Sequence, residues 1–193
     1  MTDFLSDDFW NQRYVDGTTG WDLGEISPPI KAYVDQLENK NLRILVPGAG
    51  NAHEVSYLYE QGFTNVHVLD FAPLAIQGFL KKHPNFPADQ AHVANFFEFE
   101  GSFDLIIEQT LFCAIDPSLR SDYARKAASL LVDGGKLVGL LFNRKFDGGP
   151  PFGGSKEEYL ERFTAHFSDI VMDECYNSIQ PRQGNELFIR LTK

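Results

Sequence analysis

The sequence predicts an α/β fold in which helices cover both faces of a mostly parallel sheet. Short apolar runs alternate with amphipathic segments along most of the chain, as they do in parallel sheets buried on both faces. The chain has 193 residues, of which 43% are hydrophobic, which suits one buried core and would be cramped for two. No repeat or low-complexity tract divides residues 1–193, so we expect one domain.

Composition narrows the class of protein further. A formal net charge of −10 repels phosphate backbones, so we expect no nucleic-acid partner. No apolar stretch reaches the length of a membrane span and the first residues do not resemble a signal peptide, so we expect a cytoplasmic protein without a membrane partner. We also expect a monomer. The five histidines have no metal-ligand spacing, so no metal is expected. Cys113 and Cys175 are interpreted as buried thiols.

The elements alternate in order along the first three quarters of the chain. Pro28 and Pro29 suit the first turn of a helix, and apolar residues at helical spacing continue it to residue 39. The elements expected next are a strand at 43–47, a helix at 52–61, a strand at 66–70, a helix at 73–82, strands at 91–94 and 103–108, a helix at about 118–131, and a strand at 136–142. Gly134 and Gly135 are expected to end the last of these helices.

The carboxyl-terminal part has a different pattern. Residues 144–154 form a Gly/Pro loop, after which Ser155 caps a helix with Glu158 at the capping-box position. Strands near 169–178 and 185–192 are expected to form an antiparallel hairpin. Dinucleotide-binding folds have six parallel strands instead. A hairpin on a mostly parallel, seven-stranded sheet is typical of the Rossmann-like class I methyltransferase fold.

The loop after the first strand carries Gly48 and Gly50. Glycines there allow a tight turn and let a ligand approach the backbone, although a lone pair of glycines also occurs for packing reasons. A dinucleotide fingerprint would have a third glycine at the position of His53. Because that glycine serves pyrophosphate binding, its absence favours an adenosine cofactor without pyrophosphate.

Asp70 closes the second strand, 20 residues after Gly50. This is the spacing at which an acid accepts hydrogen bonds from ribose hydroxyls. Taken alone, Asp70 would be interpreted as a solvated acid at a strand end. Its place in the same βαβ unit as the two glycines favours a role in cofactor binding.

Two further pairs of residues end strands at the same edge of the predicted sheet. Phe96 could form a wall for adenine and Asn95 could face its amine, or Phe96 could be an ordinary core aromatic. Glu108 and Gln109 could contact the methionine half of the cofactor or the substrate. Glu108 could equally be a buried acid paired with a base such as Arg120.

The segment 1–27 is rich in aromatic residues. It contains both tryptophans of the chain, Trp10 and Trp21, and also Tyr14. We expect it to form a lid over the strand ends. The alternative, an amphipathic helix on the sheet edge, suits Trp10 better than Trp21, which lies in a Gly/Thr loop.

Taken together, several motifs resemble those of the thiopurine S-methyltransferase family, especially its thiol/halide methyltransferase branch. The motifs, in chain order, are Phe9–Tyr14, Gly20–Gly24, Val46–Gly50 with His53 and Glu54, Phe103–Glu108, Phe112–Pro117 with Arg120, Gly149–Phe152, and Ser178–Arg182 with Glu186. They span nearly the whole chain. The chain departs from the pattern at Asn95, where many methyltransferases have Asp, and at Glu108, where Asp is common.

The resemblance implies an enzyme that moves a methyl group from S-adenosylmethionine to a small soft nucleophile, such as a thiol, hydrosulfide, halide or thiopurine-like sulfur, leaving S-adenosylhomocysteine. It implies cofactor contacts from Trp10, Tyr14, Trp21, Gly48, Gly50, Asp70, Asn95, Phe96, Glu108 and Gln109. Trp21, Phe152 and Arg182 are the candidates for the acceptor site, although Arg182 could simply pair with Glu186. A non-catalytic sensor of S-adenosylmethionine and an NAD(P)-dependent enzyme remain alternatives.

Overall fold

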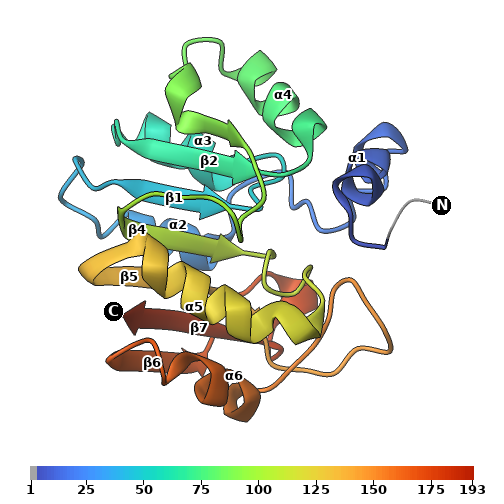
Figure 1. The fold of residues 1–193 in the computed structure, drawn as a ribbon, viewed down its shortest axis with the longest axis vertical. Helices are drawn as coiled ribbons and strands as arrows, with labels where there is room; N and C mark the ends of the chain where they lie inside the picture. The colour runs from blue at the N-terminus through green and yellow to red at the C-terminus, as the bar shows by residue number, and fades with distance from the viewer. Residues whose placement is uncertain (1–3) are drawn as a thin grey trace.

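The computed structural model describes residues 4–193, in which seven strands form one sheet of order β3-β2-β1-β4-β5-β7-β6 (Figure 1). Strands β1 to β5 are parallel, and β7 pairs antiparallel with both β5 and β6. The strands are β1 (Ile44–Pro47), β2 (Val66–Asp70), β3 (Ala91–Val93), β4 (Phe103–Gln109), β5 (Leu131–Phe142), β6 (Asp169–Glu174) and β7 (Glu186–Thr192). The predicted mostly parallel, seven-stranded sheet with a terminal antiparallel hairpin is confirmed.

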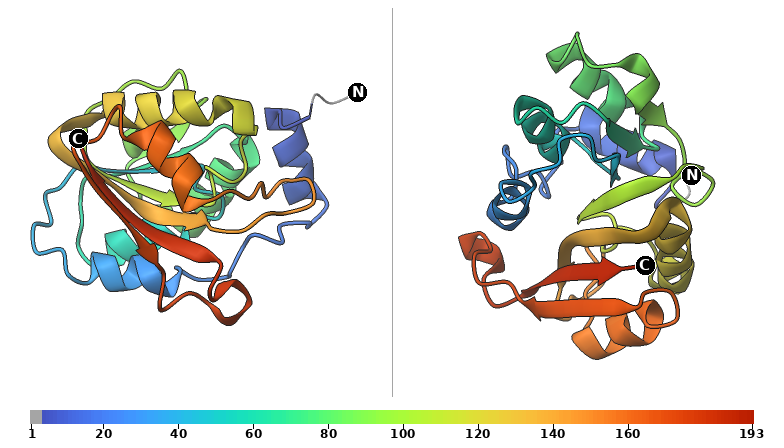
Figure 2. Two further views of the ribbon diagram at one scale, coloured as in Figure 1. Left: turned by 90° about the horizontal axis from the view of Figure 1, so that it is seen from below. Right: turned by 90° about the vertical axis from the view of Figure 1, so that its left-hand side faces the viewer.

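Helices cover both faces of this sheet (Figure 2). The α-helices are α1 (Asp7–Val15), α2 (Pro28–Val34), α3 (His53–Glu60), α4 (Pro73–Lys82), α5 (Arg120–Leu130) and α6 (Lys156–Phe163). Successive side chains of a strand point to opposite faces, so each strand contributes to two cores. In β1, Leu45 packs into the core beneath α5 and α6, whereas Ile44 and Val46 pack into the core beneath α2, α3 and α4.

Helix α1 lies beyond the carboxyl ends of the parallel strands, next to the start of α4 (Figure 1). Ser6 caps it, because the Ser6 side chain accepts a hydrogen bond of 3.2 Å from the backbone N–H of Phe9. The Asn11 side chain accepts a hydrogen bond of 3.1 Å from the N–H of Leu74, which joins α1 to the start of α4. Within residues 4–193, no helix is long and apolar enough to cross a membrane.

Two helix ends differ from the prediction by two residues or more. Helix α2 ends at Val34 rather than at residue 39, because the backbone N–H groups of Gln36 and Leu37 bond to carbonyls three residues back and the chain leaves the α-helix. The helix expected from 118 begins at Arg120, after a 3₁₀ turn at Pro117–Leu119.

Gly134 and Gly135 were expected to end a helix, and this prediction is wrong. Helix α5 ends at Leu130 and β5 begins at once at Leu131, so both glycines lie inside the strand. The pairing of β4 with β5 shifts at this point, which marks a bulge, and Gly134 has φ of +77°. Lys193 pairs its backbone with both glycines and so extends the sheet around them.

The predicted cap of α6 is present in part. The Ser155 side chain accepts a hydrogen bond of 3.4 Å from the N–H of Glu158. The Glu158 carboxylate, however, lies 3.0 Å from the guanidinium of Arg120. The capping residue is therefore correct, while the acid of the capping box serves to join α6 to α5. The sixth strand also ends earlier than expected, at Glu174.

Candidate functional site

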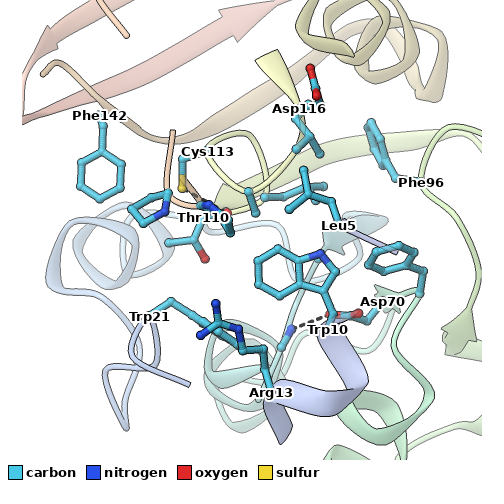
Figure 3. Close-up of a pocket in the computed structure, with 18 of the residues that line it drawn as sticks. Leu5, Trp10, Arg13, Trp21, Asp70, Phe96, Thr110, Cys113, Asp116 and Phe142 are labelled. Carbon is cyan, nitrogen blue, oxygen red and sulfur yellow. Dashed lines mark hydrogen bonds between the residues drawn. The ribbon is translucent and has the colours of Figure 1, made fainter. Parts of the chain in front are cut away.

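A cavity of about 730 Å³ opens at the carboxyl ends of the strands, between the sheet and α1 (Figure 3). This is where ligands bind in open α/β sheets. It is lined by the amino-terminal segment, the glycine loop, the ends of β2 to β5 and two later loops. The lining residues used below are Trp10, Arg13, Tyr14, Trp21, Gly48, Gly50, Asp70, Asn95, Phe96, Thr110, Cys113, Asp116, Phe142, Arg144, Phe146, Pro150, Pro151 and Arg182.

The glycine loop after β1 leaves no room for side chains. Gly48 has φ of +59°, and a Cβ added to it would lie 2.9 Å from the Leu111 side chain. Gly50 has φ of +57°, and a Cβ there would lie 3.2 Å from the Tyr14 hydroxyl. Glycine is required at both positions, because L side chains rarely adopt this backbone conformation. The loop therefore presents bare backbone to the cavity.

Asp70, at the end of β2, is buried and fixes the same loop. One carboxylate oxygen accepts a hydrogen bond of 2.9 Å from Gly50 N, and the other accepts one of 2.9 Å from Ala72 N. Burial raises the pKa of Asp70, and the backbone hydrogen bonds act in the opposite direction. A carboxylate has about four acceptor positions, so Asp70 can still accept hydroxyl groups from a ligand in the cavity.

Asn95 and Phe96 follow β3 and line the cavity next to Asp70. Phe96 lines the cavity and also belongs to the core, because its ring is largely buried and stacks on Tyr123 with 5.0 Å between centroids. The Asn95 side-chain oxygen accepts a hydrogen bond of 3.0 Å from Phe97 N. This contact leaves the amide nitrogen of Asn95 available to a ligand.

Three aromatic residues of the amino-terminal segment cover the cavity. Trp10 and Trp21 meet edge to face with 5.3 Å between ring centroids, and Tyr14 meets Trp21 at 6.0 Å. All three line the cavity, as a lid would. Burial raises the pKa of the Tyr14 hydroxyl, and the nearby Asp70 and Asp22 carboxylates raise it further, so Tyr14 stays neutral.

The lid segment is held by hydrogen bonds at Asp22 and at the Trp21 carbonyl. Asp22 accepts hydrogen bonds from Asn51 and, at 2.7 Å, from His53, which begins α3. Burial would raise the pKa of Asp22, but hydrogen bonds from Gly24 N, His53 and Asn51 outweigh it and lower that pKa. The Arg182 guanidinium donates a hydrogen bond to the Trp21 carbonyl at 3.3 Å.

The end of the cavity away from Asp70 is mostly apolar, and we call it the apolar end. It is lined by Trp21, Thr110, Cys113, Phe142, Arg144, Phe146, Pro150, Pro151 and Arg182. Cys113 donates its thiol hydrogen to the Thr110 carbonyl at 3.2 Å, and burial raises the pKa of that thiol to about 12. Cys113 is therefore a wall of the cavity and no nucleophile at neutral pH.

Glu108 and Gln109 lie behind the cavity rather than in its wall. Glu108 is fully buried at 0% exposure, and it accepts hydrogen bonds from the Tyr123 hydroxyl and, at 2.9 Å, from Phe112 N. Burial raises the pKa of Glu108 to about 7. Gln109 accepts a hydrogen bond of 3.3 Å from Ser27. Glu108 thus holds the loop that forms the wall, and Gln109 joins the end of β4 to Ser27.

Three further residues singled out from the sequence are Arg120, Phe152 and Arg182. Arg120 pairs with Glu158 and not with Glu108, which the sequence had offered as its alternative partner. Phe152 does not line the cavity, although the preceding prolines do. Arg182 lines the cavity and also pairs with Glu186 at 3.4 Å.

Arg13 was not identified from the sequence but lines the cavity. It follows Trp10 by three residues and precedes Tyr14, so the three share one face of α1. Helical spacing from Trp10 was a signal that could have found it. Within residues 4–193, no group of three or more His, Cys, Asp or Glu side chains is placed to hold a metal ion.

Comparison with known proteins identifies the family. Residues 5–187 match the family described as thiopurine S-methyltransferase. The chain is 32% identical over 191 residues to the probable thiol methyltransferase 2 of Arabidopsis thaliana, covering 95% of this chain and 84% of that protein. It is 29% identical over 191 residues to thiocyanate methyltransferase 1 of Brassica oleracea, with 95% and 84% covered.

A solved structure supports the fold independently. The 1,6-didemethyltoxoflavin-N1-methyltransferase of Burkholderia thailandensis, bound to its substrate and S-adenosylhomocysteine, superposes with a TM-score of 0.75. Its sequence identity is 19%, and the match covers 98% of this chain and 87% of that one. The match to the family spans the glycine loop, Asp70 and both walls of the cavity. The chain belongs to the thiopurine S-methyltransferase family of S-adenosylmethionine-dependent methyltransferases.

Proposed function

We propose that this methyltransferase transfers the methyl group of S-adenosylmethionine to a small soft nucleophile, either a thiol or a related species such as hydrosulfide, halide or a thiopurine-like sulfur. The observation that carries the proposal is the apolar end of the cavity, which we assign to the methyl acceptor and call the acceptor end. It is lined by aromatic and apolar side chains and has no strong base. No histidine, lysine or glutamate lines the cavity within residues 4–193. The pKa of Asp116 is lowered by its hydrogen bonds from Ser118, which makes it a weak base.

The residues at the other end of the cavity suit the cofactor. Gly48 and Gly50 form a cradle that side chains would fill, which fits close approach of the adenosine to the backbone. We assign the ribose hydroxyls to Asp70 and the adenine to Asn95 and Phe96, because all three residues line the wall of the cavity. Trp10, Tyr14 and Trp21 would cover the cofactor from the lid.

The chemistry needs alignment more than acid–base catalysis. The bound cofactor supplies a methyl group already activated by a positively charged sulfur. The thiol loses its proton to solvent, and at a pKa near 8.5 a few per cent is ionised at neutral pH. The thiolate lone pair then forms the new S–C bond, while the old C–S bond breaks and its electrons remain on the donor sulfur. The protein has to hold the two sulfurs in line and exclude water.

Two other functions make different predictions. An NAD(P)-dependent enzyme would need a pyrophosphate-binding loop with a third glycine, and this chain has His53 at that position. The antiparallel hairpin of β6 and β7 is also absent from the dinucleotide-binding fold. A sensor domain would bind S-adenosylmethionine without turnover. The aromatic lid favours an enzyme, because covering a site excludes water from a reaction and has little use in a sensor.

The test is turnover with a panel of acceptors. Purified protein is incubated with S-adenosylmethionine and hydrosulfide, a small thiol or iodide, and S-adenosylhomocysteine is measured. We expect turnover with at least one acceptor, and a lower kcat/KM in Trp21→Ala. Tyr176→Ala is the matched control, since Tyr176 is an exposed aromatic outside the cavity. Tight cofactor binding without turnover of any acceptor would favour the sensor, and full activity of Trp21→Ala would remove that residue from the site.

A further inference from the structure

The cavity carries more positive charge than the net charge of the molecule would suggest. The chain has a formal net charge of −10, yet Arg13, Arg144 and Arg182 all line this one cavity. Arg182 has a carboxylate partner, Glu186, at 3.4 Å. Within residues 4–193, neither Arg13 nor Arg144 has a carboxylate within 4.0 Å.

The two acids that line the same cavity already accept hydrogen bonds from the protein. Both oxygens of Asp70 accept backbone hydrogen bonds, from Gly50 and Ala72. Asp116 accepts from the backbone N–H of Ser118 at 2.8 Å and from its hydroxyl at 2.7 Å. Two arginines of the cavity therefore have no carboxylate partner, whereas both aspartates already accept hydrogen bonds. This distribution of charge favours an anionic ligand.

Arg13 is the better placed of the two unpaired arginines. It is half-buried on α1, and its guanidinium stacks over the Phe9 ring at 5.2 Å from the centroid. Figure 3 shows it extending from α1 toward Thr110, in the space beside Trp10. A guanidinium offers five N–H donors, and no side-chain hydrogen bond of Arg13 is formed within residues 4–193. Stacking on Phe9 restricts the plane in which those donors lie.

The walls of the acceptor end suit an organic acceptor rather than a single ion. Phe142, Phe146, Pro150 and Pro151 form apolar surface around this end of the cavity. A halide or hydrosulfide would leave most of that surface in contact with water. An acceptor with an apolar body would bury it, at about 25 cal/mol per Å² of apolar area.

We infer that Arg13 is a specificity-determining residue that selects acceptors carrying an anionic group, such as a carboxylate or sulfonate, in addition to the reacting sulfur. The inference rests on the proposed function and narrows its substrate class to anionic organic thiols. Arg13 lies on the lid, so an anion bound to it would also join the lid to the acceptor. Arg144 also lines the cavity and is exposed, so it is a second cation that attracts the anion.

The test compares two thiols of similar size, 4-mercaptobenzoate and 4-methylthiophenol, which differ in the remote anionic group. We expect wild type to have the higher kcat/KM with 4-mercaptobenzoate. In Arg13→Gln the ratio of the two kcat/KM values should fall about tenfold, equivalent to about 1.4 kcal/mol, through KM of the anionic thiol. Arg13→Lys should retain part of the preference. Arg125→Gln is the control, since it removes a charge from an exposed pair with Asp122 outside the cavity.

Each other outcome identifies what fails. Methylation of both thiols without preference, or an unchanged ratio in Arg13→Gln, overturns the inference and leaves the proposed function intact. A fall in the ratio only in Arg144→Gln overturns the assignment to Arg13. A tenfold loss of S-adenosylhomocysteine affinity in Arg13→Gln, measured by calorimetry, would show that Arg13 acts through the lid and also overturns it. Methylation of neither thiol by wild type would contradict the proposed function itself.

Discussion

Replacing Asp70 by asparagine should weaken the binding of S-adenosylhomocysteine by roughly 10- to 150-fold. The carboxylate lies in the cavity wall and accepts hydrogen bonds of 2.9 Å from both Gly50 N and Ala72 N. An asparagine keeps one acceptor oxygen, so it can serve only one of those two donors and loses its charge. A hydrogen bond to a charged group contributes about 1.5–3 kcal/mol, and every 1.4 kcal/mol is tenfold in affinity.

Calorimetric titration with S-adenosylhomocysteine measures this effect, and Asp169→Asn is the control because Asp169 is an exposed acid on β6. Leaving a buried backbone N–H of Gly50 or Ala72 without a partner also costs about 1–3 kcal/mol of stability. Denaturant unfolding of Asp70→Asn therefore has to confirm that the titrated protein is folded. A dissociation constant within threefold of wild type in folded Asp70→Asn would refute the assignment of the ribose to Asp70.

Three further predictions concern stability and reactivity. Gly139→Ala should lower the free energy of unfolding by about 1–3 kcal/mol in a denaturant titration, because a Cβ there would lie 2.3 Å from the Glu108 carbonyl oxygen; wild-type stability would contradict this. Burial, Arg43 and His92 lower the pKa of His67 to about 4, so between about pH 4 and pH 6.5 the unfolded chain binds more protons than the folded protein. The free energy of unfolding should therefore fall as the pH drops from about 6.5 to about 4, and it should fall less steeply in His67→Gln. Equal slopes in the two proteins would contradict this prediction. Cys113, with its pKa raised to about 12, should resist a thiol-specific reagent until the protein unfolds, and Cys113→Ala should still methylate thiols; inactivity of a folded Cys113→Ala would suggest a chemical role.

The parts of the fold that depend on local pattern could be predicted from the sequence. The strand ending at Asp70 and the helix beginning at Pro73 have the predicted bounds, because an apolar run and a proline at the first helical turn are local signals. Gly134 and Gly135 resemble a helix end just as strongly. Their actual place inside β5 depends on pairing with Lys193, at the far end of the chain, which no local pattern contains.

The candidate site divides along the same line. Gly48, Gly50 and Asp70 meet because their spacing in a βαβ unit fixes their geometry. Glu108 ends a strand at the same edge, yet its side chain turns into the core because Tyr123 of α5 donates a hydrogen bond there. Whether a strand-end acid faces a cavity or the core depends on such distant partners, and sequence spacing alone does not determine it.

The most direct test of the account is where the methyl group goes. The protein is incubated with a donor whose methyl group carries deuterium and with 2-mercaptoethanol, which offers one sulfur and one oxygen to the same cavity. Mass spectrometry then identifies the labelled product and its linkage. The account predicts the intact labelled methyl group on sulfur and an equal amount of S-adenosylhomocysteine. Label on oxygen, or S-adenosylmethionine bound with no labelled product from this or any other soft nucleophile, would contradict it.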